Sequence, residues 1–240
     1  MGISGGGGTR QISPGSIRAK AHDGSANAPR DIARRVLNIA VAIIGIVISA
    51  PLMIIVAVLV RLDSKGPAIY RQERVGLCRR GLRWPGQRER RRAENMGGRV
   101  FTIYKFRTMT IAQSGEERWA SRNDARITRI GRILRATRID ELPQLFNVLR
   151  GDMNIVGPRP EQPGIFQDLR EEVHGYSRRQ KVLPGITGLA QVNLGYDTSI
   201  EDVRRKVDLD LEYISERSVV RDLLIMAKTV PVMIFQKVWM

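Results

Sequence analysis

The longest apolar run of the chain covers residues 36–60 and is interrupted only by Asn38, Gly45, Ser49 and Pro51. At ~1.5 Å per residue, a helix of this length can cross a bilayer core of roughly 30 Å. Pro51 removes a helical hydrogen bond near the middle and kinks the helix, and Ser49 is placed to satisfy a freed carbonyl nearby. We therefore expect a membrane helix over residues 30–62 with a kink at Ser49 and Pro51.

Basic residues flank this run on both sides. They are Arg30, Arg34 and Arg35 before it and Arg61, Lys65, Arg71 and Arg74 after it. Basic residues mark the cytoplasmic side of a membrane helix, and here both ends carry that mark. A re-entrant helix that enters, bends at Pro51 and returns on the same side fits the flanks and the proline. A plain spanning helix that tolerates its proline fits the segment equally well, so the residues alone leave both open.

The rest of the chain alternates strand patterns with helical ones. Strand patterns occupy "GPAIYRQERVG" and residues 100–106. Helical patterns occupy residues 126–138, a short stretch after Asp140 that Gly151 stops, and residues 200–217. We expect "NIVGPRP" and "VLPGITGLAQV" to be extended, and residues 219–240 to form an amphipathic surface helix on the domain or the membrane, not a second span. These patterns predict an α+β fold, mainly helical, with a single compact domain over residues 63–240.

Two segments lack apolar periodicity. Residues 1–29 are rich in Gly, Ser, Ala and Arg, which predicts a disordered tail. Residues 77–99 are rich in arginine with scattered Gly and Pro, which predicts a solvated loop able to touch anionic lipid headgroups.

Composition narrows the partners and the chemistry. A formal net charge of +16 implies an anionic partner, which is nucleic acid, a membrane surface or a phosphorylated ligand. The only cysteine is Cys78, and the only histidines are His22 and His174. A disulfide framework within the chain and a thiolate or His-rich metal site are therefore excluded. A metal would have to be a hard ion with oxygen ligands.

Two adjacent acids, Asp140 and Glu141, lie among arginines in "TRIDELPQLFNVLRGDMNIVGPRP". Pro143 belongs in the first turn of a helix, so we expect both acids at the N-terminus of that helix. The ordinary role of acids there is to cap amides and complement the helix dipole. The same position, among positive charges, is expected to favour ionised Asp140, which could attack phosphorus or hold Mg²⁺ against a phosphate. Arg135 and Arg159 could then neutralise phosphoryl oxygens.

An arginine recurs at every third position from Arg126 to Arg138. On an α-helix a three-residue repeat drifts around the axis, so these arginines form a sloping band. Such a band can contact phosphates or can be a solvated face, and the band alone favours the solvated face.

Several long motifs occur in the order found in a known family. They are "RLDSKGPAIYRQERVG", "FTIYKFRTM", "RITRIGRILRATRIDELPQLFNVLRGDMNIVGPRPE", "PGITGLAQV" and "LDLEYISERSVVRDLLIMAKT". On these motifs, over about residues 31–235, the chain resembles the bacterial sugar transferase family, the monotopic polyprenyl-phosphate hexose-1-phosphate transferases. The resemblance implies a catalytic domain on the cytoplasmic face of a bacterial inner membrane. It also favours the re-entrant helix, which family members break at a proline.

The resemblance further implies a reaction. Family members move a sugar 1-phosphate from a nucleotide diphosphate sugar to a membrane polyprenyl phosphate, the initiating step of exopolysaccharide, capsule or O-antigen type glycan synthesis. A UDP-sugar donor, undecaprenyl phosphate as acceptor and Mg²⁺ are implied, with UMP released. The matching motifs make Asp140 the implied nucleophile of a covalent aspartyl intermediate, and Asp140 with Glu141 the implied magnesium site. The implied substrate-binding residues are Arg135, Arg159, Lys105, Arg107 and Gln191.

Two features depart from the family pattern. Many relatives have a serine directly before the helix-breaking proline, whereas this chain has Ala50 there and Ser49 one step earlier. The arginine-rich segment 77–99 is longer than the short turn usual in relatives. The transferred sugar and the presence of a homo-oligomer are left open.

Two other functions compete with the transferase. A membrane-tethered basic protein could bind nucleic acid through its arginines, and steeply salt-dependent DNA affinity unaffected by changing Asp140 would identify it. A scaffold for a polysaccharide machine would keep the fold and lose the activity, but the acids and arginines of the matched site are all present. We therefore expect an enzyme without a nucleic-acid partner.

Overall fold

The computed structural model describes residues 28–78, 98–110, 124–195 and 199–235. The tail predicted over residues 1–29 lies outside the described residues except for its last two, which open the first helix. The arginine-rich loop predicted over residues 77–99 also lies outside them, except for two residues at each end.

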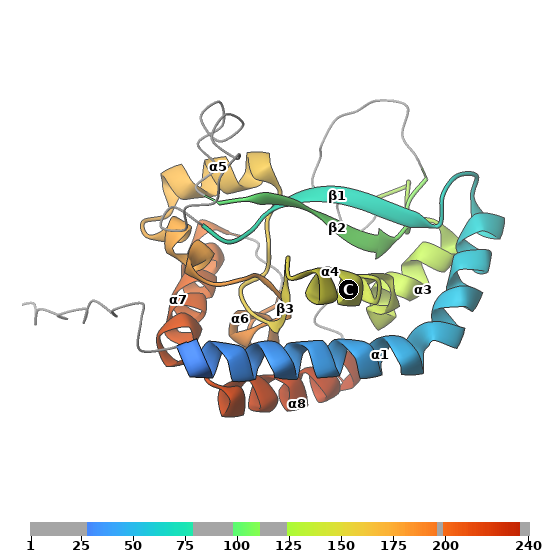
Figure 1. Cartoon of the computed structure of the whole chain (residues 1–240). Coiled ribbons are helices and arrows are strands. Elements are labelled where there is room, and N and C mark those ends of the chain that lie inside the picture. Colours follow the sequence, from blue (N-terminus) through green and yellow to red (C-terminus); the bar gives the residue numbers. More distant parts are fainter. Residues whose placement is uncertain (1–27, 79–97, 111–123, 196–198, 236–240) are drawn as a thin grey trace, which may run out of the picture.

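The apolar run forms one helix, α1 (Ala28–Asp63), of 36 residues with Pro51 inside it. The helix predicted over residues 30–62 is thus confirmed, and α1 bends in its second half (Figure 1). Pro51 has no amide hydrogen for the carbonyl four residues earlier, that of Val47. The Ser49 hydroxyl donates instead to the carbonyl of Gly45 at 2.6 Å. The prediction that Ser49 satisfies the freed carbonyl is therefore wrong, although a serine bonded in this way also favours a bend.

The next elements are two antiparallel strands, β1 (Ile69–Val75) and β2 (Val100–Phe106). Ile69 lies opposite Phe106, and Val75 lies opposite Val100. Both strands were predicted, and the bounds of β2 match the prediction. Because successive side chains of a strand point to opposite faces, Lys105 lies on the face of β2 that also carries the buried Phe101 and Ile103.

Helices dominate the remainder, so the predicted mainly helical α+β class is confirmed. The elements are α3 (Arg129–Thr137), η1 (Ile139–Glu141), α4 (Gln144–Arg150), β3 (Asn154–Val156), α5 (Pro163–Glu172), η2 (Tyr176–Lys181), β4 (Gly185–Thr187), α6 (Leu189–Asn193), α7 (Ile200–Glu216) and α8 (Val219–Phe235). The prediction that "VLPGITGLAQV" is extended throughout is wrong. Its strand ends where Val156 pairs with Thr187 in the parallel β3–β4 ladder, and α6 begins two residues later.

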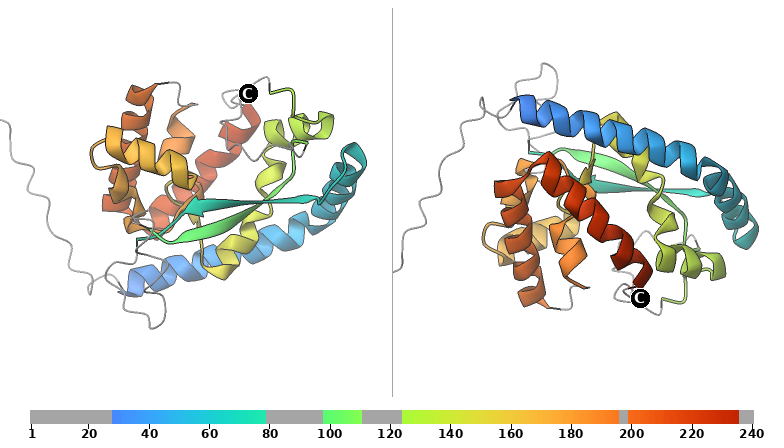
Figure 2. Two further views of the ribbon diagram at one scale, coloured as in Figure 1. Left: turned by 90° about the horizontal axis from the view of Figure 1, so that it is seen from above. Right: turned by 90° about the horizontal axis from the view of Figure 1, so that it is seen from below.

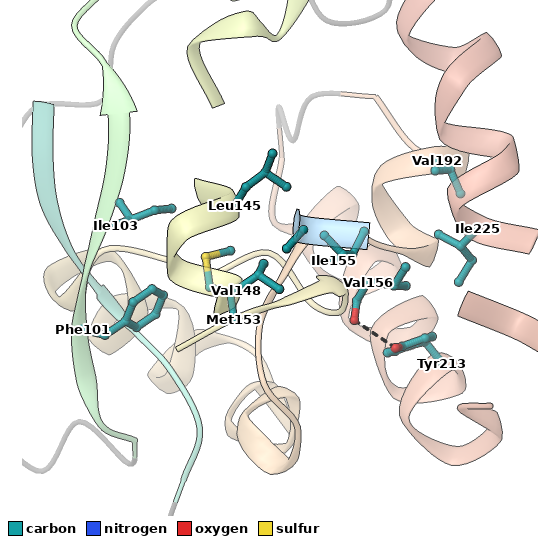
Figure 3. Close-up of a cluster of buried hydrophobic side chains, with 11 residues drawn as sticks. Phe101, Ile103, Leu145, Val148, Met153, Ile155, Val156, Val192, Tyr213 and Ile225 are labelled. Atoms are coloured by element: carbon teal, nitrogen blue, oxygen red, sulfur yellow. Dashed lines mark hydrogen bonds between the residues drawn. The ribbon is translucent and has the colours of Figure 1, made fainter. Parts of the chain in front are cut away.

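The core lies between the hairpin and the long helices. α4 is placed between β2 and α1, and α8 lies against α1 (Figures 1 and 2). Gly45 lets α1 approach α4 closely, because a Cβ added at this position would lie 3.1 Å from a methyl group of Leu145. The main cluster of buried apolar side chains comes from the hairpin, the central helices and the C-terminal helices (Figure 3). Its labelled members are Phe101, Ile103, Leu145, Val148, Met153, Ile155, Val156, Val192, Tyr213 and Ile225.

The N-terminal half of α1 is fastened to this body by polar side chains. Arg34 is 5% exposed; its Nε donates to Asp222 at 2.9 Å and its Nη2 to the Tyr213 hydroxyl at 2.6 Å. Asn38 accepts a hydrogen bond from the amide of Ile155. Removing one partner of a buried ion pair leaves an uncompensated charge and costs about 3–5 kcal/mol. Arg34, which the sequence suggested as a membrane-flanking charge, is thus an internal anchor.

The C-terminal end of α1 is fastened to the same body. The buried guanidinium of Arg107, directly after β2, donates to the carbonyls of Ser64 and Lys65 at 2.6 and 2.5 Å. The Asp63 carboxylate accepts from the amide of Ile130 at the start of α3. Arg107 Nη2 also lies 3.4 Å from the carbonyl of Val60 in the last turn of α1, where carbonyls need donors, so Arg107 ties the end of α1 to the hairpin.

The outer face of α1 is apolar. Within the part of the chain that the structure describes, α1 is the one helix long and apolar enough to cross a membrane, with a mean hydropathy of 3.0 over its most apolar window. Its exposed apolar side chains include Ile43, Ile44, Val47, Ile48, Leu52, Ile54, Ile55, Val58 and Leu59. α8 adds exposed Val220, Leu223, Leu224 and Val230, as expected for an amphipathic helix. Patches of this kind mark membrane or protein contacts.

Candidate active site

The acid pair lies in η1, a short 3₁₀ turn between α3 and α4. The residue that joins α3 to η1 is Arg138, with φ of 59° in the left-handed region. The amide of Glu141 donates back to the Arg138 carbonyl at 3.1 Å, which closes the turn. The acids were expected at the N-terminus of the following helix, with Pro143 in its first turn. Pro143 is instead the N-cap residue of α4, and the acids lie before it in η1.

Glu141 is the centre of a charge cluster. Its side chain is 8% exposed, and its Oε1 accepts from Lys105 Nζ at 2.9 Å and from Arg159 Nη2 at 2.8 Å. Arg138 Nη1 lies 3.4 Å from the same oxygen. Burial alone would raise the pKa of Glu141, but Arg159, Lys105 and Arg138 together hold that pKa well below its usual range. Glu141 is therefore a fixed negative charge that gathers three cations.

Asp140 differs from its neighbour although both are buried. Among the described residues, no group donates a hydrogen bond to its buried Oδ1. Burial raises the pKa of Asp140, repulsion by Glu141 raises it further, and the nearby cations only partly offset both, so that the pKa is about 6. The expectation that the surroundings favour the ionised form is therefore wrong, because burial outweighs the positive charges.

Helix capping does not account for this pair. Glu141 Oε1 is taken up by side-chain cations, and Asp140 Oδ1 accepts nothing among the described residues. A buried carboxylate oxygen without a donor is costly, and such groups concentrate at functional sites.

Hydrogen bonds to the backbone around Arg159 hold this residue in place. Its carbonyl accepts from Arg179 at 3.0 Å, and the next carbonyl accepts from Arg74 at 3.1 Å. Arg179 is itself buried in an ion pair with Asp210 at 2.7 Å. The residues just before Arg159 bond to β4, where the amide of Gly157 donates to the Thr187 carbonyl at 2.9 Å. A long side chain fixed at its base can thus reach Glu141 from a distant segment.

Of the predicted substrate-binding residues, the structure brings Lys105 and Arg159 to the acids by direct contact. Arg135 Nε donates to the Thr108 hydroxyl at 3.0 Å. Arg107 holds the end of α1, and Gln191 donates to the carbonyl of Ile186 at 3.0 Å. Substrate roles for Arg135, Arg107 and Gln191 stay predictions.

Two arginines of this region were not singled out from the sequence. Arg138 belonged to the arginine band that was interpreted as a solvated face, yet it contacts Glu141. Arg74 of β1 is part-buried, and its Nε has no hydrogen-bond partner among the described residues. Burial lowers the pKa of Arg74 even though Glu161 lies nearby, and Arg159 lowers it further. The three-residue spacing of Arg138 and Glu141 was a sequence signal that could have placed Arg138 at the site. The position of Arg74 beside the site is visible only in the folded hairpin.

The two acids fit a magnesium ion that shares its ligands with a substrate. Mg²⁺ is usually held by one or two carboxylates together with substrate phosphates. Asp140 Oδ1 has no donor among the described residues, and Glu141 Oε2 makes a long contact of 3.5 Å with Arg159. No group of three or more His, Cys, Asp or Glu that could hold a metal alone occurs within the described ranges. Phosphate and water oxygens would have to complete the ligand set.

Known proteins resemble this chain over most of its length. The family model for bacterial sugar transferase matches residues 29–236. UDP-glucose:undecaprenyl-phosphate glucose-1-phosphate transferase of Caulobacter vibrioides is 41% identical over 204 residues, which cover 84% of this chain and 69% of the relative. UDP-N-acetylgalactosamine-undecaprenyl-phosphate N-acetylgalactosaminephosphotransferase of Aeromonas hydrophila is 41% identical over 200 residues, which cover 82% of this chain. The matched region spans only 42% of that relative's length.

We predict that Asp140→Asn stabilises the protein without magnesium or substrate. A carboxyl whose folded pKa of about 6 exceeds its ordinary value of 3.8 favours folding below that ordinary value. This contribution is lost as pH rises toward 6 and above. Each pKa unit is worth about 1.4 kcal/mol, and each kcal/mol moves Tm by roughly 2–4 °C at this size. Asn should therefore raise Tm by several degrees at pH 7.5 and by almost nothing at pH 4.

Thermal unfolding in detergent with a chelator would measure this difference. Glu201→Gln is the control, because Glu201 is 60% exposed in its pair with Arg204 and its loss should leave Tm almost unchanged. An Asp140→Asn variant less stable than the parent at pH 7.5 would contradict the burial argument.

Proposed function

Because the chain belongs to the bacterial sugar transferase family, we propose that it transfers a sugar 1-phosphate from a UDP-sugar to undecaprenyl phosphate. UMP is the second product, and the lipid-linked diphosphate sugar begins the synthesis of an exopolysaccharide or a related glycan. The names of the two relatives, a glucose-1-phosphate and an N-acetylgalactosamine phosphate transferase, support the donor and acceptor classes. Since both relatives are 41% identical to this chain, identity does not choose between their sugars.

The observation that carries the proposal is the contrast within the acid pair. Asp140 offers a buried oxygen that accepts no hydrogen bond among the described residues, while Glu141 beside it gathers Lys105, Arg138 and Arg159. An unpaired carboxylate next to clustered cations suits attack on a phosphorus whose oxygens those cations bind. A pKa of about 6 leaves Asp140 mostly ionised at pH 7 and more basic than an ordinary carboxylate.

The proposed reaction has two displacement steps. Asp140 attacks the sugar-bearing phosphorus, the bond from that phosphorus to the nucleoside phosphate oxygen breaks, and UMP leaves with the electron pair. The sugar phosphate is then carried as an acyl phosphate on Asp140. An oxygen of the polyprenyl phosphate attacks the same phosphorus, which releases the carboxylate and forms the lipid diphosphate. Lys105 and Arg159, fixed at Glu141, supply positive charge to the phosphoryl oxygens.

Magnesium completes the proposed site. Asp140 and Glu141 are the carboxylates that would hold it with the donor phosphates, and it would neutralise charge on the diphosphate. Glu141 keeps two short hydrogen bonds from cations, so its Oε2 is the oxygen better placed to share with an ion.

We further propose that α1 is re-entrant and that the catalytic domain lies on the cytoplasmic face of a bacterial inner membrane. The N-terminal half of α1 is bound to the domain through Arg34 and Asp222, and its C-terminal end is bound through Arg107. A helix with both ends held by one polar body favours entry and exit on the same side. Its exposed apolar face can then enter one leaflet while Pro51 bends the helix. Exposed Lys65 carries the positive charge expected on the cytoplasmic side.

We predict that the purified protein, given undecaprenyl phosphate and a panel of UDP-sugars, releases UMP with at least one donor. EDTA should stop the release, and added Mg²⁺ should restore it. Asp140→Asn should reduce turnover by at least about 1,000-fold, as expected for loss of a nucleophile, while Glu201→Gln should have no effect. A folded, membrane-bound protein that releases no UMP from any donor in the panel would overturn the assignment.

We predict a covalent adduct when the enzyme meets the reactive donor without acceptor. Mass spectrometry of the peptide containing Asp140 should show the added mass of the sugar phosphate, and Asp140→Asn should abolish it. Absence of the adduct, together with kinetics that require both substrates to be bound at once, would exclude the covalent route. The transferase assignment would survive that result, with Asp140 as a metal ligand or base.

We predict that residues 30 and 65 face the same compartment. In a Cys78→Ser background, Arg30→Cys and Lys65→Cys should both resist an impermeant maleimide applied to intact cells and both react after permeabilisation. Pro51→Leu should straighten α1 and shift part of the population toward a spanning form. Labelling of either cysteine from outside in the parent helix would contradict the re-entrant arrangement.

A further inference from the structure

Gln144 is a buried glutamine at the start of α4, four residues after Asp140. Its side chain is almost completely inside the protein, with 1% of the residue exposed. The amide nitrogen Nε2 is buried, and no group among the described residues accepts a hydrogen bond from it. A buried donor without a partner costs free energy, whereas an apolar side chain of similar shape would fill the same space without that cost. Packing alone therefore does not explain an amide at this position.

Gln144 lies about one helical turn from Asp140. The two residues between η1 and α4 keep right-handed helical dihedrals, with φ and ψ of −52° and −38° at Leu142 and of −62° and −15° at Pro143. The amide of Leu142 donates to the carbonyl of Ile139 at 3.2 Å, so the helical path continues out of η1 toward α4. Because residues four apart on a helical path are neighbours, Gln144 and Asp140 lie next to each other, and both are buried.

Two unpaired atoms of opposite kind thus belong to neighbouring side chains. Asp140 Oδ1 is an acceptor and Gln144 Nε2 is a donor, yet neither has a partner among the described residues, so they do not bond to each other. A phosphoryl group suits both atoms. Its phosphorus can be attacked by a carboxylate oxygen, and its non-bridging oxygens are strong acceptors for an N–H donor. The donor and the acceptor therefore indicate the same ligand.

We propose that Gln144 is a catalytic residue whose Nε2 donates a hydrogen bond to a non-bridging oxygen of the phosphoryl group transferred at Asp140. This inference rests on the proposed function and adds a residue to it. While the bond from Asp140 to phosphorus forms and the bond to UMP breaks, negative charge is spread over the three equatorial oxygens. A fixed donor beside them stabilises that transition state. Lys105 and Arg159 are held by short bonds to Glu141, whereas the uncharged amide bonds to neither acid.

Two substitutions remove the amide and keep a similar side-chain volume. Gln144→Met preserves the length of the side chain, and Gln144→Leu repeats the test with a different shape. Gln167→Met is the matched control, because Gln167 is a partly buried glutamine of α5 outside the candidate site. Each variant is compared with the parent for Tm without ligand, for kcat and KM of UMP release, and for the rate at which the donor alone forms the adduct on Asp140.

Loss of one transition-state donor should lower kcat about 100- to 1,000-fold in Gln144→Met and Gln144→Leu. The KM for the donor should stay within about threefold of the parent, because the contact strengthens in the transition state. Adduct formation on Asp140 should slow by a factor similar to the loss in kcat. The Tm of Gln144→Met without ligand should equal or exceed that of the parent, since an unpaired buried donor is removed. Gln167→Met should match the parent in turnover.

Three results would overturn the inference and leave the transferase standing. In the first, both variants keep kcat within about twofold of the parent. In the second, the loss is confined to KM, which would make the amide a ground-state contact. In the third, both variants have a Tm clearly below that of the parent, which would assign the amide to the fold. A parent protein that releases no UMP from any UDP-sugar would instead overturn the proposed function, and this inference with it.

Discussion

The geometry of the candidate site depends on the carboxylate of Glu141, which draws two distant segments and a neighbouring arginine to one point. Lys105 comes from β2, Arg138 from the turn after α3, and Arg159 from the segment after β3, and all three reach Oε1. A buried carboxylate is tolerable only with such partners, so the pairing holds these segments together. It also concentrates positive charge beside Asp140, whose Oδ1 has no donor among the described residues. One ion-pair cluster thus holds these segments together and also provides the positive charge that a phosphate would bind.

The long apolar helix α1 is part of the same construction. Arg35 donates to the carbonyls of Val148 and Leu149 at the end of α4, which directly follows the acid pair. Asn38 binds the amide of Ile155 in β3, just before the segment that carries Arg159. The polar residues of α1 therefore hold both sides of the site, while its opposite face is apolar. This arrangement suits an enzyme whose acceptor is a lipid and whose donor is water-soluble, because anchoring and catalysis share one framework.

Local patterns of the chain predicted much of the fold and only part of the site. The apolar run identified α1, the strand pattern located β2, and Gly151 marked the end of α4. The short helix α6 was missed because its five residues are too few for a visible helical period. Asp140 and Glu141 were identified as candidates from their motif. The lowered acidity of Asp140 was not foreseen, because burial, which a linear sequence does not display, outweighs its charged neighbours.

By itself, the sequence determined which residues carry charge, where the longest helices and the strands of the hairpin lie, and which long motifs link the chain to a family. Only the tertiary structure decided what each charge does. Arg34 had the position of a membrane-flanking charge, but it pairs with the buried Asp222. Arg107, whose substrate role stays a prediction, donates to the carbonyls of Ser64 and Lys65 just after α1. Arg138 resembled a solvated residue and instead contacts Glu141. The reason is physical: the effect of a charge depends on its distance to other charges and on its burial, and both are set by segments far apart in the chain.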